Sequence, residues 1–363
     1  MTVLGVAGCT ALILAAYGLK DSISVVVPKQ YGEIFNYDTM MNLKYEGTLN
    51  EKKNLKDAIN IDKRIKSSMM IKQTLMNGSK ANEDKEVQVR LFVPESLDKF
   101  KDYVHLLDKD TEGNIKLTDD TVVITEKLAK LLNLSVGDTI TVGDDAGTAV
   151  DLKISSIAEN YVYNYVYISE KMYEEKFGEE LEVNTVLLKL TEDGKTHEDE
   201  VAKDWLKKND ILVVTSTSYV ISSFEDIISS LNSVVVLMIV CAAALAFVVL
   251  YNLTNVNISE RIREIATIKV LGFTEKESAN YVYRENIVLS IIGIAVGLVM
   301  GIFLSNYIVS TIEMDIVMFG RSIHGISFVY AAAFTLVFTL LVNISMYGNL
   351  NNISMVESLK SVE

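Results

Sequence analysis

The architecture of this chain is decided by residues 227–259, which read IISSLNSVVVLMIVCAAALAFVVLYNLTNVNIS and contain no Asp, Glu, Lys or Arg. A bilayer core of about 30 Å needs roughly 20 apolar helical residues to cross it. Further uncharged runs occupy residues 1–19, 286–312 and 322–356. With a mean hydropathy of +0.25, this segregation predicts a multi-pass α-helical membrane protein with four transmembrane helices, at residues 1–19, 223–253, 284–312 and 326–348.

The first run is open to other interpretations. Val6-Ala7-Gly8-Cys9 is similar to a bacterial lipoprotein cleavage box, and the segment could also pass as a secretory signal. However, no Lys or Arg precedes it, and the apolar residues continue past Cys9 to Leu19. We therefore expect a transmembrane helix.

The placement of Lys and Arg in short loops orients the spans. Only Arg321 lies in the short loop after the third span, whereas the segment between the second and third spans carries five basic residues: Arg261, Arg263, Lys269, Lys276 and Arg284. That segment is predicted to be cytoplasmic. Counting outward, both termini, including a tail at 349–363, lie in the cytoplasm, and residues 20–226 lie outside.

Residues 20–222 are expected to form an α+β extracytoplasmic domain. Period-2 patterns predict strands, and turn signals separate them from helical patterns. The four predicted strands are Glu86–Val93, Thr139–Val142, Val150–Ile154 and Val186–Leu190. A small barrel-like lobe is expected at 121–182. Four tyrosines alternate along a predicted strand in it: Tyr161, Tyr163, Tyr165 and Tyr167. Their rings either pack as in an ordinary strand or form an aromatic surface for a ligand or lipid headgroups.

The outer region is acidic. Residues 20–226 hold 27 Lys/Arg and 39 Asp/Glu, a net charge of −12 out of −14 for the chain. A solvated surface explains this, and the alternative is a cationic ligand such as a basic peptide. A nucleic-acid partner is not expected.

No chemistry-bearing constellation occurs in the sequence. Both cysteines lie in apolar runs, and the three histidines are far apart and lack ligand spacing. We therefore predict no catalytic, metal or cofactor site in this chain.

A long helix is expected at 223–253, where Ser222-Ser223-Phe224-Glu225 has the pattern of a capping box. Such a helix would be roughly 46 Å long, which exceeds the hydrocarbon thickness. It would form a stalk joined to the second span. A break near Asn232 is the alternative.

Residues 255–277, NVNISERIREIATIKVLGFTEKE, predict a short amphipathic helix at 255–273 between two spans. Gly272 is placed to end it, and Thr274 with Glu277 forms a capping box for the next helix. An interfacial helix is one interpretation. The segment also resembles the loop after the second span of FtsX-like permeases, and the order of one span, a large outer domain and three spans resembles MacB-type ABC transporter permeases. Leu134-Ser135-Val136-Gly137-Asp138 is similar to their small lobe.

The resemblance implies a permease subunit in a bacterial plasma membrane, with ATP and Mg²⁺ bound by a separate ABC ATPase. It identifies the segment as a coupling helix that docks on that ATPase. The residues implied in this coupling are Glu260, Arg261, Arg263, Glu264, Ile265, Lys269 and Gly272. It further implies that ATP-driven motion reaches the outer domain by mechanotransmission, for export or extraction of a peptide, lipid or antibiotic.

Two features leave the assembly open. Small residues at four-residue spacing in the third span predict a helix-packing face, within the subunit or between subunits: Gly293, Gly297, Gly301 and Ser305. The basic segment that usually precedes the first span of these permeases is not seen before Met1. The partner is therefore a second permease subunit or a covalently attached permease half. The competing functions are a membrane-anchored receptor or sensor, and an ATP-driven regulator of a cell-envelope enzyme or sensor kinase.

Overall fold

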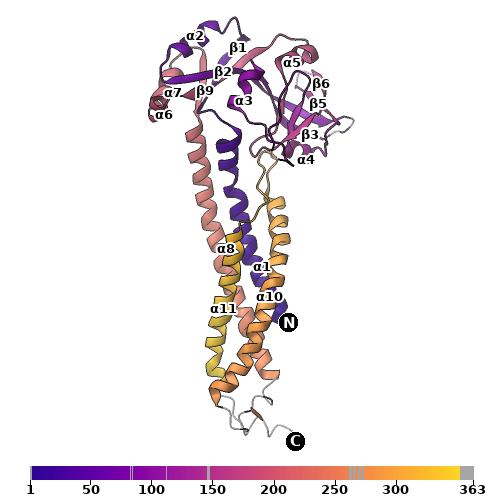
Figure 1. Cartoon of the computed structure of the whole chain (residues 1–363), viewed down its shortest axis with the longest axis vertical. Coiled ribbons are helices and arrows are strands. Elements are labelled where there is room, and N and C mark those ends of the chain that lie inside the picture. The colour runs from indigo at the N-terminus through magenta and orange to yellow at the C-terminus, as the bar shows by residue number, and fades with distance from the viewer. Residues whose placement is uncertain are drawn as a thin grey trace. The chain divides into compact units, whose positions relative to one another are not determined.

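The computed structural model describes residues 2–81, 83, 85–111, 113–144, 148–260, 264, 267–268, 271 and 274–351. The chain divides into two compact units. A helical unit consists of Met1–Ser24, Ile228–Ile312 and Gly320–Glu363, and a sheet unit consists of Val25–Ile227 and Glu313–Phe319. Figure 1 labels their helices and strands. The sheet unit corresponds to the domain expected at 20–222, but it also includes a loop from between two apolar runs.

The helical unit is built from α1 (Thr2–Ser24), α10 (Glu275–Ile312), α11 (Gly325–Asn351) and the later part of α8 (Thr217–Glu260). In the described part of the chain, three helical stretches are long and apolar enough to cross a membrane: Thr2–Ile34, Ile287–Ile312 and Gly325–Ser345. The apolar part of α8, Ser233–Val249, is shorter. The chain is thus a membrane protein, and the count of four spans stays a prediction.

The long helix α8 begins at Thr217 instead of the predicted residue 223. Ser216 Oγ accepts a hydrogen bond from the Tyr219 N–H at 3.1 Å, which satisfies a donor in the first turn. Ser222 and Ser223 do not cap the helix, because their hydroxyls donate to the Tyr219 carbonyl inside it. From Thr217 the helix continues without a break at Asn232, and its 44 residues end at Glu260.

The small residues of α10 lie against α1. These are the residues predicted to form a packing face, Gly293, Gly297, Gly301 and Ser305. A Cβ added to Gly297 would come within 2.6 Å of the Ala7 carbonyl oxygen, and Ser305 Oγ occupies the space that a Cβ on Gly18 would need. The face therefore packs on a helix of the same chain, with the backbones in close approach.

The sheet unit contains one ten-stranded mixed sheet. Its strands are β1 (Thr39–Thr48), β2 (Ile65–Lys80), β3 (Glu86–Pro94), β4 (Val123–Thr125), β5 (Thr139–Gly143), β6 (Ala149–Lys153), β7 (Ser156–Ala158), β8 (Tyr165–Tyr167), β9 (Glu182–Leu190) and β10 (Ile211–Ser216). The order is β10-β1-β9-β2-β3-β8-β4-β7, with β5 pairing with β2 and β6. The pairs β3/β8 and β4/β7 are parallel, and the other pairs are antiparallel.

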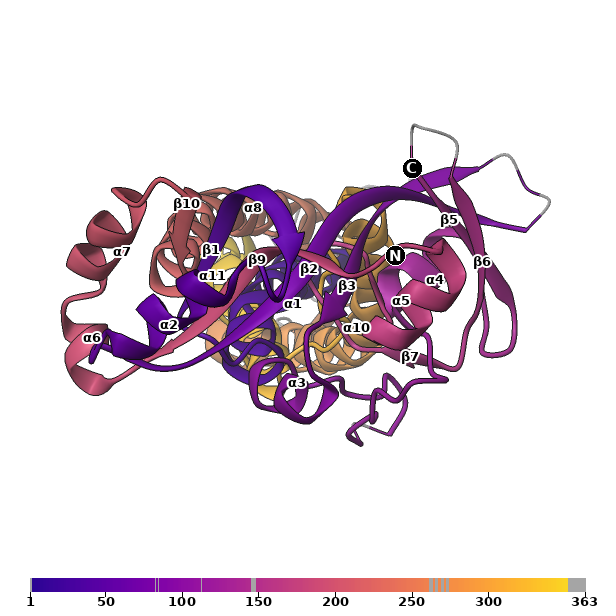
Figure 2. The same ribbon diagram turned by 90° about the horizontal axis from the view of Figure 1, so that it is seen from above.

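Strand β2, which we call the spine of the sheet, pairs with β3, β5 and β9. Met69 pairs with Leu187 of β9, whereas Leu75 pairs with Arg90 of β3. Figure 2 shows β2 running across the unit, with β1 and β9 toward one end and β5 and β6 toward the other. Because one 16-residue strand serves several partners, the two ends of the unit share a sheet.

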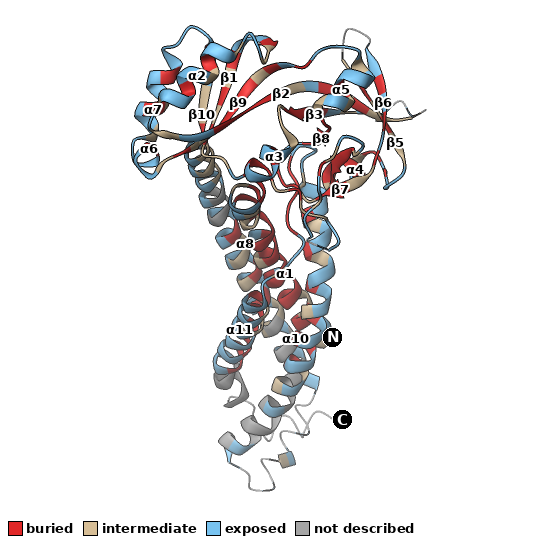
Figure 3. Cartoon of the chain, turned by 45° about the horizontal axis from the view of Figure 1, so that its top comes forward, coloured by how far each residue is buried: buried red, intermediate tan, exposed pale blue. Residues whose placement is uncertain are grey.

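Helices flank the sheet on both sides of this spine. They are the π-helix η1 (Pro28–Ile34) and the helices α2 (Lys53–Ile61), α3 (Leu97–Tyr103), α4 (Glu126–Leu131), α5 (Glu170–Phe177), α6 (Glu192–Thr196) and α7 (Glu198–Leu206). Met69, Met70 and Ile71 are buried in succession on β2, which α2 and α3 contact. Consecutive burial means that both faces of the strand are covered. Figure 3 shows buried residues along the strands of the sheet unit and also along α1.

The barrel-like lobe expected at 121–182 is not a separate closed barrel. Its β5 pairs with the last residues of β2, and its β8 pairs with β3. Within the described ranges, no pairing joins β6 to β7. One hydrophobic core includes Ile140 and Leu152 of this region together with Met41 and Leu188 of the rest. The length of β2 explains the difference, because the strand extends into the region and supplies its edge.

The close approach of α10 to α1 gives the first prediction. Gly297→Ala places a methyl group 2.6 Å from the Ala7 carbonyl oxygen, so the helices must separate. We expect the thermal midpoint of the detergent-solubilised chain to fall, with a loss of about 1–3 kcal/mol. Gly8→Ala on α1 is the matched control, because nothing lies within 4 Å of its added Cβ. Equal midpoints for the two variants would contradict the packing.

Candidate functional site

The predicted coupling segment at 255–273 lies partly outside the described residues. Glu260 is the last residue of α8 and Glu264 is helical, and both are exposed. The remaining predicted residues lie outside the described ranges: Arg261, Arg263, Ile265, Lys269 and Gly272. The expected capping box follows. The Thr274 N–H donates to Glu277 at 2.9 Å and the Glu277 N–H donates to Thr274 Oγ1 at 3.4 Å, so α10 begins at Glu275.

In the sheet unit, a buried amide from η1 organises residues 160–163, which we call the junction segment. Gln30 is fully buried, and its Oε1 accepts hydrogen bonds from the Tyr161 N–H at 2.8 Å and the Val162 N–H at 3.1 Å. Its Nε2 donates to Asn160 Oδ1 at 3.0 Å. Buried backbone donors need partners, and here one side chain satisfies two of them.

Asn160 completes this network from within the junction segment. Its Nδ2 donates to the carbonyl oxygens of Val162 and Tyr163, both at 2.8 Å. These bonds hold a tight irregular conformation, in which Tyr163 has a φ of 63°. That value is uncommon for a residue other than glycine. The segment thus lies outside the named strands, and these side-chain amides help to fix its conformation.

The tyrosines expected to alternate along one strand have different roles. Only Tyr165 and Tyr167 belong to β8, while Tyr161 and Tyr163 lie in the junction segment. The expected regular strand is wrong at 161–163, because Gln30 takes the N–H groups that a ladder would use. Tyr165 is buried, which raises its pKa to about 12, and its ring meets Phe35 edge-on at 5.9 Å.

Tyr165 and Phe35 belong to an aromatic cluster that also includes Tyr31 of η1 and Phe224 of α8. Tyr31 of η1 lies 6.2 Å from the ring of Phe224, and the Thr217 hydroxyl donates to the Tyr37 carbonyl at 2.9 Å. The Arg90 guanidinium lies 3.8 Å from the ring centroid of Tyr163, within range of a cation–π interaction. The chain segments that connect the sheet unit to α1 and α8 therefore meet at one cluster.

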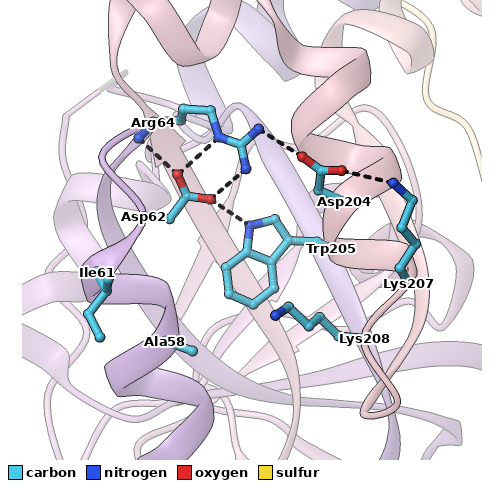
Figure 4. A pocket seen from close by; sticks show the side chains of 8 residues that line it. All are labelled: Ala58, Ile61, Asp62, Arg64, Asp204, Trp205, Lys207 and Lys208. Carbon is cyan, nitrogen blue, oxygen red and sulfur yellow. Dashed lines mark hydrogen bonds and ion pairs between the residues drawn. The ribbon is translucent and has the colours of Figure 1, made fainter.

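A separate pocket of about 490 Å³ lies where α2, β2 and α7 come together. Figure 4 shows the Arg64 guanidinium between two carboxylates, at 2.9 Å from Asp62 and 3.1 Å from Asp204. Trp205, the chain's single tryptophan, donates its indole N–H to Asp62 at 3.2 Å. Hydrogen bonds from Arg64 hold the pKa of Asp62 below its usual range, and Asp62 in turn raises the pKa of Arg64.

This ion-pair network is internally satisfied. Asp204 also accepts from Lys207 at 3.1 Å, so two basic and two acidic side chains bind one another. The arrangement braces the end of α2 and the start of β2 against α7. Four of the five charged side chains that line the pocket are thus paired with one another, and we assign the network a structural role.

No group of three His, Cys, Asp or Glu side chains in the described part of the chain is arranged to hold a metal ion. The structure instead brings together residues that the sequence analysis did not single out, Gln30 and Asn160. They are separated by 130 positions, and isolated amides carry no spacing signal. Only the proline before Gln30, at the first position of η1, marks a local change after the first apolar run.

Comparison with known protein families finds a match for one part of the chain. Residues 236–355 match the FtsX-like permease C-terminal family. This confirms the resemblance to FtsX-like permeases over a segment that includes most of α8 and all of α10. Comparison with curated protein sequences finds no match.

Two solved structures are similar to part of the chain at low identity. The periplasmic region of MacB from Actinobacillus actinomycetemcomitans is 12% identical, with a TM-score of 0.35 over 55% of this chain and 97% of that one. The extracellular domain of the noncanonic ABC-type transporter YknZ from Gram-positive bacteria is 12% identical, with a TM-score of 0.33 over 50% of this chain and 99% of that one. At these scores, neither decides the function of the chain.

The Asp62 network gives a prediction about pH. A carboxyl group whose pKa is lowered by folding stabilises the fold above its unfolded pKa, about 3.9, and this contribution is lost as the pH falls through the folded value. Asp62→Asn should therefore destabilise the sheet unit at pH 7 by about 1–3 kcal/mol. The difference from wild type should shrink below about pH 4. Unfolding followed by Trp205 fluorescence measures both.

Asp57→Asn is the matched control for this experiment, since Asp57 is an exposed residue on α2. It should leave the unfolding curve unchanged at every pH. A pH-independent loss of stability in Asp62→Asn would contradict the ionised pairing with Arg64.

Proposed function

We propose, from the FtsX-like permease C-terminal match over residues 236–355, that this chain is the permease component of an ABC transporter. In this proposal a separate ABC ATPase binds ATP and Mg²⁺ and hydrolyses the nucleotide, and this chain transmits the resulting motion. The exported or extracted substrate would be a peptide, a lipid or an antibiotic. The single observation that carries the proposal is the family match.

The geometry of α8 supports such a role. Its 44 residues form one helix, and at 1.5 Å per residue this is about 66 Å long. A continuous helix resists bending far better than a loop, so displacement at Glu260 reaches Ser216 and β10. The predicted coupling residues begin at the end of this helix, where an ATPase would act on it.

The packing of α1 on α10 supports the same proposal. The close contact along Gly293, Gly297 and Gly301 leaves little freedom between these helices. Tight interhelical packing lets a group of helices move as a body instead of deforming separately. We infer that α1 and α10 shift together when the segment before α10 is pushed.

Charge reversal in the predicted coupling segment tests the proposal. Glu264 is exposed, so Glu264→Arg should not disturb folding, but it places a positive charge where a complementary ATPase surface would meet a negative one. We expect Glu264→Arg and Arg263→Glu to reduce co-purification of the ATPase with this chain and to reduce ATP-dependent activity. Charge reversals at interfaces typically cost several kcal/mol.

Glu192→Arg provides the control, because Glu192 is an exposed residue of α6 and undergoes the same chemical change. It should leave ATPase association intact. Unchanged association in both coupling variants would sink the assignment of this segment. A wild-type chain that binds no ABC ATPase at all would favour a receptor or sensor instead.

A further inference from the structure

The connection between α10 and α11 is longer than a turn between helices requires. It contains residues 313–324, twelve in all, whereas connections in helix bundles typically take about 2–8 residues. Its first part, Glu313–Phe319, belongs to the sheet unit. Val317, Met318 and Phe319 are buried there. The loop is therefore an integral part of the sheet unit, although it is bonded to two apolar helices.

The loop pairs with the junction segment through its backbone. The Tyr163 N–H donates to the Ile316 carbonyl at 2.7 Å, and the Met318 N–H donates to the Tyr161 carbonyl at 2.8 Å. Val162 and Val317 are antiparallel partners between these two bonds. They form a non-hydrogen-bonded pair, the kind in which opposite Cα atoms lie about 4.5 Å apart.

A buried ion pair fixes the start of the loop. Lys127 Nζ of α4 lies 3.2 Å from Glu313 Oε2, and the side chains are only 9% and 6% exposed. The other carboxylate oxygen accepts the Phe319 N–H at 2.8 Å, which closes the loop on itself. Removing either charge would leave the other buried without its opposite charge, a costly state. The pair therefore specifies one position for the loop on α4.

The junction segment is consequently held from two sides. Gln30 binds the Tyr161 and Val162 N–H groups, and the loop binds the Tyr161 carbonyl and the Tyr163 N–H. The segment leads through Asn164 into β8, which pairs with both β3 and β4. A displacement of η1 or of the loop should therefore be passed to β8, since the backbone N–H and C=O groups of Tyr161, Val162 and Tyr163 are all hydrogen-bonded.

We propose that Glu313–Phe319 is a clamp through which α10 and α11 move the sheet unit, with the junction segment as the point of attachment. This inference rests on the proposed function of the chain as an ATP-driven permease. Lys127 and Glu313 are positioning residues, because they hold the clamp and touch no nucleotide. Releasing the clamp should uncouple the sheet unit while ATP hydrolysis by the partner continues.

A reversible disulfide makes the clamp testable. The expected Cα separation of the Val162–Val317 pair falls within the range that a disulfide spans. In the full chain with Cys9→Ala and Cys241→Ala, the pair Val162→Cys and Val317→Cys should cross-link under mild oxidation. Failure to cross-link would overturn the docked position of the loop.

The functional test uses the complex with the ABC ATPase in lipid nanodiscs, with ATP compared against ADP. Hydrogen exchange at β8 and the junction segment reports the response of the sheet unit, and phosphate release reports hydrolysis. Lys127→Glu places two carboxylates together and should release the clamp. With the cysteine pair reduced, we expect loss of the ATP-dependent exchange difference and continued phosphate release. Oxidation should restore the difference.

Two further variants separate this effect from general destabilisation. Lys130→Glu is the matched control, since Lys130 lies on the same helix but pairs with Glu126 at 2.6 Å, and it should behave as wild type. Glu313→Gln removes the charge while keeping an acceptor for the Phe319 N–H, and it should also lose the ATP-dependent difference.

The outcomes separate the two proposals. If the reduced Lys127→Glu chain keeps the full ATP-dependent difference, or if oxidation fails to restore it, the clamp is wrong and the permease proposal stands. If the wild-type complex neither assembles nor responds to ATP, the proposed function fails first.

Discussion

Satisfaction of backbone hydrogen bonds is the constraint on which this structure depends. In hydrocarbon every backbone donor and acceptor needs a partner within the protein, so the apolar runs are helices. The difficulty moves to the helix ends, where unpaired groups must find other partners. At the start of α11, the Asp21 side chain accepts hydrogen bonds from the His324 N–H at 2.9 Å and the Ser327 hydroxyl at 2.6 Å. In the junction segment, which is not part of a helix, the Gln30 side chain accepts the Tyr161 and Val162 N–H groups.

Much of the architecture could be predicted from the sequence, because apolar runs and period-2 alternation are local patterns. The strands expected at Glu86–Val93 and Val186–Leu190 correspond to β3 and β9, and Thr139–Val142 corresponds to β5. The spine β2 could not be found this way. Its Met69-Met70-Ile71 core is buried on successive residues, so no period-2 alternation exists to detect. The start of α8 was missed because Ser216 and Ser222 offer equally good capping hydroxyls, and only the fold selects Ser216.

The candidate site depends on contacts between distant residues, which a single sequence does not encode in any local form. Lys127 and Glu313 look like two ordinary surface charges until the fold buries them together. Gln30 and Asn160 likewise belong to no motif. The coupling segment was the opposite case, because its order of charges and apolar residues is itself the signal. Sequence reasoning therefore points to the segment where, in our proposal, an ATPase would dock, whereas the loop contacts that we propose to receive the motion are visible only in the structure.

In the proposed clamp, the buried Lys127–Glu313 ion pair differs in one physical respect from an apolar contact. Apolar side chains of similar volume would fill the space between α4 and the loop at comparable or lower cost, because burying two charges requires their desolvation. Apolar contacts, however, tolerate sliding, whereas a buried pair with one carboxylate oxygen on Lys127 and the other on the Phe319 N–H has one satisfied geometry. A connection that must transmit displacement gains from a contact that cannot slip. On this argument, the buried charge at the loop and the buried amide at η1 serve the same purpose from two sides of residues 160–163.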